Sequence, residues 1–280
     1  SDYNAAADIA HLQRISEVYD AARLQNPPAG CPAGDAIFVI GLQRTGTTLV
    51  ERILSSHTDV CSIGESTNFP VEIMKLAQAV ESVDPARGGL LERSARVDFR
   101  ALGLNYLASS RAQGAAAVRF VDKQPVNYLN CGPIHLALPN ARIIALSRGA
   151  MDSCLALYKT LFRSACLFSY DLEELGRYFV AYRKLMGHWK TLLPDDMLEV
   201  RYEALVSDPE HETRRMLEFC GLAWEERVLR FQDNPAAVLT ASAVQVRQPM
   251  YTSSVGKWRR FEPHLAPLAR VLSDAGIPLD

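Results

Sequence analysis

The chain has 280 residues, of which 48% are apolar and 22% charged, and its formal net charge is −2 at pH 7. This length and composition are typical of a globular protein with one large domain or two small ones. A net charge so close to zero argues against a nucleic-acid-binding surface, so any basic site must be local.

In chain order, we expect a helix over residues 4–24, a strand over 36–41, helices over 47–56, 69–82 and 98–110, a strand over 116–122, a helix over 127–137, a strand over 141–147, helices over 151–162 and 171–188, a strand over 197–202, and helices over 209–222 and 264–276. Residues 25–35, with three prolines and two glycines, form a linker, and residues 232–262 form a long loop. Strands that alternate with helices predict an α/β fold with a parallel sheet, and its ligands bind at the carboxyl ends of the strands.

The sequence also indicates several absences. No apolar run approaches the eighteen residues of a membrane helix, and no signal peptide is visible, so we expect a cytoplasmic protein without membrane contact. The six cysteines form no C-x-x-C pair, which indicates neither a zinc site nor a disulfide framework. The chain begins with Ser1, so a longer parent protein is left open.

The segment FVIGLQRTGTTLVERIL, residues 38–54, is typical of a phosphate-binding loop, because a strand leads through a glycine-containing turn into a helix. A loop that hydrolyses nucleoside triphosphates carries lysine directly after its second glycine. Here Gly46 is followed by Thr47 and Thr48. The loop therefore predicts an anion site of a different kind, with a turn that binds nothing as the alternative.

The residues around this loop indicate which anion it binds. Arg44 lies inside the loop, where its forked guanidinium can hold two anionic oxygens. A magnesium site would need a carboxylate after a neighbouring strand, and the nearest candidate, Asp122, is followed at once by the cation Lys123. We therefore expect a nucleotide whose terminal group carries less charge than a triphosphate, and no metal.

Several ordered segments resemble the sulfotransferases that use 3′-phosphoadenosine-5′-phosphosulfate (PAPS), most closely the tyrosylprotein sulfotransferases and the bacterial sulfotransferases associated with tetratricopeptide repeats. The segments are GLQRTGTTLVERILSSHTDVCSIGES, VDKQPVNY, LPNARIIALSRGAMDSCLALY, VRYEALVSDPE, FCGLAW and VGKWRRFEPHLAPL. The resemblance covers roughly residues 34–275. It implies a P-loop-type parallel sheet flanked by helices, with a sulfotransferase domain over residues 34–280 and an N-terminal helix and linker over residues 1–33.

The resemblance also assigns roles in catalysis. Glu65 matches the general base of the tyrosylprotein branch, and Arg44 and Lys123 match the pair that neutralises charge in the transition state. From the residues alone, Glu65 could instead cap a surface turn, and Lys123 could be an ordinary solvated lysine. His57 is the rival base, because another branch uses histidine, although its place at a helix end favours a structural role.

For the nucleotide, the resemblance implies PAPS as co-substrate, without metal. The positions that match nucleotide contacts are Arg44, Thr45, Gly46, Thr47, Thr48, Arg148, Ser153, Tyr202 and Lys257.

The segment after Arg148 departs from the family pattern. The chain reads Arg148-Gly149-Ala150 where Arg-Asp-Pro is usual, and Ala156 stands where a serine contacts the 3′-phosphate. Ser153 is the nearby substitute for this hydroxyl.

Four other positions keep two interpretations. Tyr202 could be a core aromatic, and Arg259 and Arg260 could be solvated or could supply compensating charge beside Lys257. His135 has helical spacing with apolar neighbours, which favours packing over reactivity.

The sequence thus predicts a metal-free, PAPS-dependent sulfotransferase that acts on a hydroxyl-bearing small molecule or peptide, with a tyrosyl or other phenolic group as the favoured acceptor. A P-loop small-molecule kinase and a non-catalytic nucleotide-binding module are the alternatives, and a structural protein is favoured only by the helix over residues 4–24. A homodimer and an upstream helical-repeat domain are left open.

Overall fold

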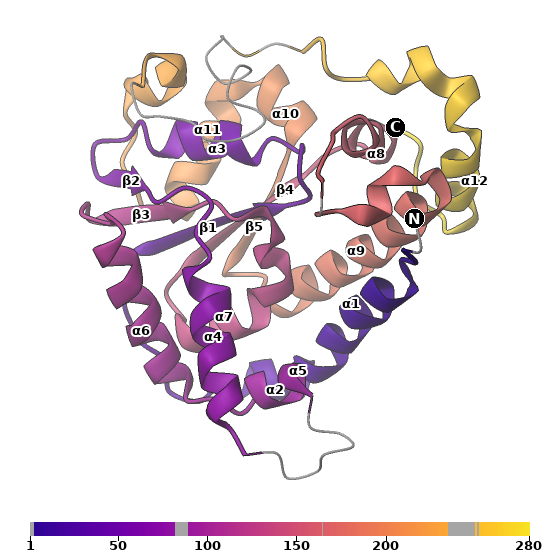
Figure 1. Ribbon diagram of the computed structural model, residues 1–280. Helices are drawn as coiled ribbons and strands as arrows, with labels where there is room; N and C mark the ends of the chain where they lie inside the picture. The colour runs from indigo at the N-terminus through magenta and orange to yellow at the C-terminus, as the bar shows by residue number, and fades with distance from the viewer. Residues whose placement is uncertain (1–2, 82–88, 164, 235–249, 251) are drawn as a thin grey trace.

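The computed structural model describes residues 3–81, 89–163, 165–234, 250 and 252–280, and it shows a sheet between layers of helices (Figure 1). Its strands are β1 (Ala36–Gly41), β2 (Val60–Ser62), β3 (Arg119–Asp122), β4 (Arg142–Ser147) and β5 (Met197–Arg201). They lie in the order β2-β3-β1-β4-β5, and every neighbouring pair is parallel. The predicted α/β class with a parallel sheet is confirmed.

Strand β1 forms the centre of the sheet, and all six of its residues are buried. Successive side chains of a strand point to opposite faces, so Phe38 and Ile40 join one apolar cluster and Ile37 and Val39 join the other. Burial on both faces explains why this strand is an unbroken apolar run.

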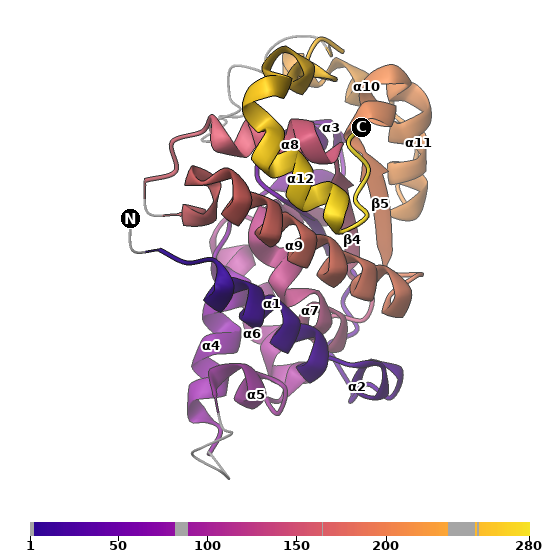
Figure 2. The same ribbon diagram turned by 90° about the vertical axis from the view of Figure 1, so that its right-hand side faces the viewer.

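The helices divide between the two faces (Figures 1 and 2). One group of helices contributes buried residues to the apolar cluster that contains Phe38. These helices are α1 (Ala6–Val18), α2 (Ala21–Gln25), α4 (Asn68–Ala79), α6 (Phe99–Ala112), α7 (Cys131–Ala137), α8 (Ala150–Tyr158), α9 (Leu172–Leu192) and α12 (Ala266–Asp274), with α5 (Leu90–Ser94) packed against them. The other group contributes buried residues to the apolar cluster that contains Ile37. These helices are α3 (Thr47–Leu54), α10 (Tyr202–Ser207), α11 (Pro209–Phe219) and the 3₁₀ helix η3 (Glu226–Asp233).

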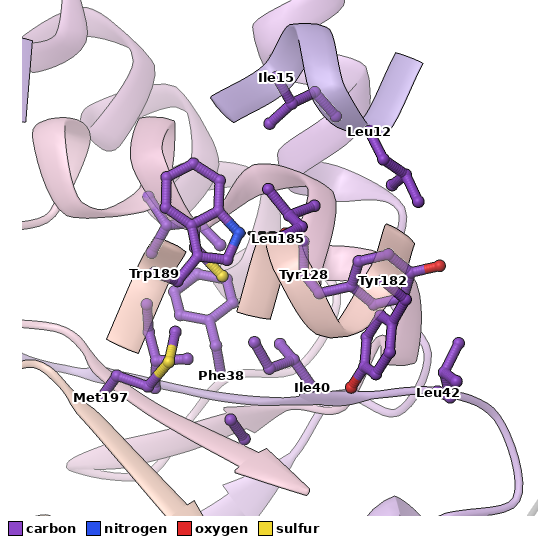
Figure 3. Packing of buried hydrophobic residues seen from close by; sticks show 14 of the residues in the cluster. Leu12, Ile15, Phe38, Ile40, Leu42, Tyr128, Tyr182, Leu185, Trp189 and Met197 are labelled. Atoms are coloured by element: carbon purple, nitrogen blue, oxygen red, sulfur yellow. Dashed lines mark hydrogen bonds between the residues drawn. The ribbon is translucent and has the colours of Figure 1, made fainter. Parts of the chain in front are cut away.

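Trp189 of α9 is completely buried in the larger cluster, close to Phe38 and Met197 (Figure 3). Its ring nitrogen donates to the carbonyl of Tyr128 at 2.8 Å, so this buried polar atom is satisfied. Leu12 and Ile15 of α1 belong to the same cluster, so the N-terminal helix packs onto the main core. The division of the chain at residue 33 stays a prediction.

Some predicted boundaries were wrong for local reasons. The helix over residues 4–24 is two helices, because the Asp20 side chain accepts the backbone N–H of Arg23 and begins α2. The helix over residues 127–137 begins as the 3₁₀ helix η1 (Pro125–Asn130), and the helix over 151–162 ends at Tyr158. The strand over 197–202 ends at Arg201, and Tyr202 begins α10.

Other segments add elements that the pattern did not predict. Strand β2 has three residues, and η2 (Leu167–Tyr170) is one short 3₁₀ helix. Part of the loop over residues 232–262 is the 3₁₀ helix η5 (Lys257–Leu265), whereas residues 235–249 and 251 lie outside the described residues. In the parts of the chain that the structure describes, no helix combines the length and the apolar character that crossing a membrane requires.

Two glycines of α9 test how this helix packs. A Cβ atom at the exposed Gly187 would meet nothing within 4 Å, whereas one at the buried Gly176 would meet Val271 of α12 at 2.9 Å. We expect Gly187→Ala to raise the free energy of unfolding by about 0.5–1 kcal/mol, because alanine restricts the unfolded chain and favours the helix. We expect Gly176→Ala to lower it by about 1–3 kcal/mol through overpacking. Urea denaturation of both variants measures the difference, and equal shifts would contradict the packing of α12 on α9.

Candidate active site

The phosphate-binding loop follows β1 at the centre of the sheet. Three of its residues have positive φ, namely Gly41 at 149°, Arg44 at 68° and Gly46 at 106°. A Cβ atom at Gly41 would lie 2.7 Å from the carbonyl oxygen of Leu146, so β4 approaches too closely for a larger residue. The loop is therefore shaped by contacts with β4 and by a left-handed backbone at Arg44 that is rare outside glycine.

Helix α3 begins directly after this loop, with Gly46 as its N-cap and Thr47 and Thr48 buried in its first turn. The first amides of a helix lack partners within the helix, and the helix dipole adds positive potential there. The N-terminus of α3 therefore favours an anion. Thr45 contributes differently, because its hydroxyl donates to the carbonyl of Leu42 at 2.6 Å and holds the loop together.

Lys123 and Glu65 form an ion pair at the carboxyl end of β3. The Lys123 side chain is completely buried, whereas the Glu65 side chain is 46% exposed. The backbone fixes the pair as well, because the N–H of Lys123 donates to the carbonyl of Gly64 at 3.0 Å. The pair therefore presents a carboxylate outward, with its counter-ion behind it.

A second carboxylate, which the sequence analysis missed, lies on the other side of Lys123. Glu51 of α3 is 8% exposed, and its Oε2 lies 3.7 Å from the Lys123 Nζ. Burial raises the pKa of Glu51, and Lys123 and a 2.5 Å hydrogen bond from Ser62 oppose this rise. Its position among the apolar residues Leu49, Val50, Ile53 and Leu54 was the signal available in the sequence.

Asp122, which the sequence analysis weighed as a magnesium ligand, is completely buried. Its Oδ2 accepts the Tyr106 hydroxyl at 2.9 Å, and burial raises the pKa of Asp122 to about 7. This carboxyl group is part of the core beneath the site.

Arg148 follows β4 and contacts the loop from the other side. Its Nη1 donates to the carbonyl of Arg44 at 3.2 Å, and its Cζ lies 4.8 Å from the centre of the Tyr202 ring. The Tyr202 ring in turn covers Gly46, where a Cβ atom would lie 2.8 Å from it. Among the described residues, the Nε of Arg148 is buried without a hydrogen-bond partner, and a bound anion would satisfy this donor.

The remaining nucleotide-contact candidates lie at different depths. Ser153 is completely buried, and its hydroxyl donates to the carbonyl of Arg148 at 3.3 Å, so it supports Arg148 from behind. Ala156 lies half-buried one turn further along α8. Lys257 is exposed at the start of η5, and the exposed Arg259 stacks on Trp258, with its Cζ 4.8 Å from the ring centre.

The two histidines His57 and His135 have structural partners. The Nε2 of His57 lies 2.9 Å from the carbonyl of Ala223, and its Nδ1 accepts the backbone N–H of Asp59 at 3.1 Å. Both ring nitrogens are thus used, so the ring links the end of α3 to the segment before η3. The Nδ1 of His135 lies 2.7 Å from a carboxylate oxygen of Asp196.

The loop, Lys123 and Arg148 follow the central strand and its two neighbours, and Glu65 and Tyr202 follow the outer strands β2 and β5. This arrangement can hold two separate anionic groups, one at the start of α3 and one at Arg148. It also places an accessible carboxylate beside a buried ammonium group, where a proton can be accepted.

Comparison with known proteins agrees with this geometry. The model of the Sulfotransferase family matches residues 36–226. An uncharacterized protein of Aquifex aeolicus is 35% identical over 270 residues, which are 94% of this chain and 36% of that protein. Protein-tyrosine sulfotransferase A of Caenorhabditis elegans is 24% identical over 233 residues, 79% of this chain and 60% of the relative. The chain thus spans less than two thirds of either relative.

A solved structure shows the same fold. It is the sulfotransferase domain of the Synechococcus PCC 7002 olefin synthase, with a TM-score of 0.60 and 17% identity, covering 92% of this chain and all of that domain. At this identity the likeness concerns the fold alone.

The pKa of Asp122 predicts a pH-dependent stability. Native Asp122 holds its proton more tightly than the unfolded chain does, so its contribution to stability falls as pH rises from about 4 to about 7 and levels off above that. Asp122→Asn keeps an acceptor for Tyr106 and removes the charge. We expect the free energy of unfolding of the variant, relative to the wild type, to increase between pH 5 and pH 8 in urea denaturation. A difference that is constant, or that moves in favour of the wild type as pH rises, would contradict this assignment.

Proposed function

The chain belongs to the sulfotransferase family, and from this we propose that it moves the sulfuryl group of PAPS to a hydroxyl acceptor. The observation that carries the proposal is the ion pair between the buried Lys123 and the half-exposed Glu65. A module that only binds nucleotides has no need for a carboxylate presented beside a buried cation. A kinase would need a lysine at position 47, where the chain has threonine.

Two anion sites support PAPS as the co-substrate. The loop and the start of α3, with Arg44, Thr45, Gly46, Thr47 and Thr48, would hold the 5′-phosphosulfate. The buried and unpaired Nε of Arg148 fits the 3′-phosphate, with Ser153 behind it and Tyr202 and Lys257 beside it. These residues suit a nucleotide with phosphates at both positions.

The chain's own residues account for the transfer. The acceptor oxygen forms a bond to sulfur while the bond between sulfur and the bridging oxygen breaks, and the bonding electrons pass to that oxygen. Glu65 takes the proton of the acceptor, and Arg44 and Lys123 stabilise the charge that develops on the bridging oxygen and the sulfuryl group. The products are a sulfate ester and adenosine 3′,5′-bisphosphate.

A tyrosyl or other phenolic group is the proposed acceptor. The support is similarity to relatives named protein-tyrosine sulfotransferase, of which the Caenorhabditis elegans protein is one. Glu65 is exposed enough to meet a side chain of a peptide as well as a small phenol.

Nucleotide binding gives the first test of this function. We expect adenosine 3′,5′-bisphosphate to stabilise the protein in EDTA and to do so more than ADP, because only the former carries a phosphate for Arg148. At about 100 times its dissociation constant the ligand adds roughly 2.7 kcal/mol, which a thermal shift detects. Equal shifts with ADP, or a requirement for magnesium, would favour the kinase.

Substitution of the base gives the second test. Glu65→Gln keeps the shape of the side chain and removes its basicity, so we expect kcat to fall by about 10²–10⁴-fold with little change in nucleotide affinity. Release of adenosine 3′,5′-bisphosphate from PAPS, with phenols and tyrosine peptides as acceptors, measures the rate. Glu210→Gln, on the exposed surface of α11, is the matched control.

The rival base is tested in the same assay. His57→Ala should keep the rate within about tenfold once folded protein is compared, because both nitrogens of His57 have structural partners. An active Glu65→Gln variant together with an inactive, folded His57→Ala variant would move the base to His57.

A further inference from the structure

A buried carboxylate lies unexpectedly close to the proposed 3′-phosphate site. Asp152 is in the first turn of α8, four residues after Arg148, and is only 4% exposed. A negative charge at this place opposes the binding of another anion. Its presence therefore needs a different physical reason.

The partners of Asp152 supply that reason. One carboxylate oxygen accepts the backbone N–H of Gly256 at 2.5 Å, and the other accepts that of Trp258 at 3.0 Å. These two amides flank Lys257. Gly256 has a φ of 72°, and this left-handed turn allows both N–H groups to face one carboxylate. We call residues 252–258 the strap.

The strap is also tied to the other residues of the site. The carbonyl of Ser254 accepts the Nη2 of Arg148 at 2.6 Å, and the hydroxyl of Ser254 lies 2.7 Å from that of Tyr202. Trp258, at its end, is 6% exposed and belongs to the main apolar cluster. The strap thus contacts α8, α10 and the guanidinium group of Arg148 at once.

We propose that Asp152 is a positioning residue that latches the strap over the 3′ end of the nucleotide and so controls nucleotide release. The proposal rests on the proposed function, because it concerns the same ligand. Asp152 does not touch the nucleotide. Its charge is balanced by the two N–H groups and by the start of α8, and it fixes the backbone on both sides of Lys257.

We call the contact between Asp152 and the strap the latch. The latch should affect the release of the nucleotide more than its association. With the strap in place, Arg148 is held between the carbonyls of Arg44 and Ser254, and its Nε is left without a partner among the described residues. For the nucleotide to leave Arg148, the strap has to move. Weakening the latch should therefore raise koff, while kon, which depends on diffusion and long-range charge, changes less.

The test compares Asp152→Asn with a matched control. Asp171 also accepts two backbone N–H groups, those of Glu173 and Glu174, both at 2.9 Å, at the start of α9. We expect Asp152→Asn to raise koff and Kd for adenosine 3′,5′-bisphosphate by tenfold or more, with kon within threefold, in surface plasmon resonance. Asp171→Asn should change none of these beyond twofold. Equal effects of the two variants would overturn the proposal.

A double-mutant cycle shows whether Asp152 acts through the strap. In a Lys257→Met background, Asp152→Asn should lose the part of its effect on koff that acts through Lys257, while the part that acts through Ser254 and Arg148 remains. Fully additive effects would contradict the positioning of Lys257 by Asp152. Tyr202→Phe, which removes only the hydroxyl tie to Ser254, should raise koff by a smaller factor, and it tests the strap if Asp152→Asn does not fold.

A measurement without nucleotide separates failure of this proposal from failure of the proposed function. The chain contains three tryptophans, so 5-fluorotryptophan labelling gives three ¹⁹F resonances, and Trp258→Phe assigns one of them. Asp152→Asn should shift the Trp258 resonance alone, whereas Asp171→Asn should not. An unshifted Trp258 resonance would exclude the latch, whether or not the wild type binds the nucleotide.

Discussion

The position of β1 between β3 and β4 is the constraint on which the site depends. In a parallel sheet all carboxyl ends lie at one edge, and the strand order changes direction beside the central strand. The loop after β1 therefore lies between Lys123, which follows β3, and Arg148, which follows β4. Residues more than a hundred positions apart are brought together by strand order alone.

Within this frame the charges are arranged in two layers. Lys123, Glu51 and Asp122 are buried beneath the site, and each has a polar partner: Lys123 the two glutamates, Glu51 also Ser62, and Asp122 the Tyr106 hydroxyl. Glu65 and Lys257 are exposed above them. Buried groups that are paired hold their geometry, and this suits a reaction in which positioning and electrostatic stabilisation supply most of the rate. The exposed layer is where an acceptor and a nucleotide can be exchanged.

The sequence predicted those parts of the structure that have a strong local pattern. The strand over residues 36–41 was placed correctly, because burial on both faces requires an unbroken apolar run. Strand β2 was missed, because three residues, Val60–Ser62, are too few for any periodicity. The break before α2 depends on one cap at Asp20, which an apolar pattern does not register.

The site residues divide in the same way, into those with a local sequence pattern and those without one. The loop was visible in the sequence because its glycines and its arginine are close together, whereas its partners Lys123 and Arg148 depended on the family resemblance. Ser254 was not predicted, because it acts partly through its carbonyl oxygen, and every residue has one. Asp152 was missed because no sequence pattern tells which distant amides a carboxylate will face.

The central claim is that one nucleotide spans the start of α3 and Arg148, and a crystal structure with adenosine 3′,5′-bisphosphate tests it most directly. We expect electron density for the 5′-phosphate at the first turn of α3, between Gly46 and Thr48, and for the 3′-phosphate within hydrogen-bond distance of the Arg148 Nε. Density with the two phosphates exchanged, or a nucleotide bound away from Arg148, would contradict it.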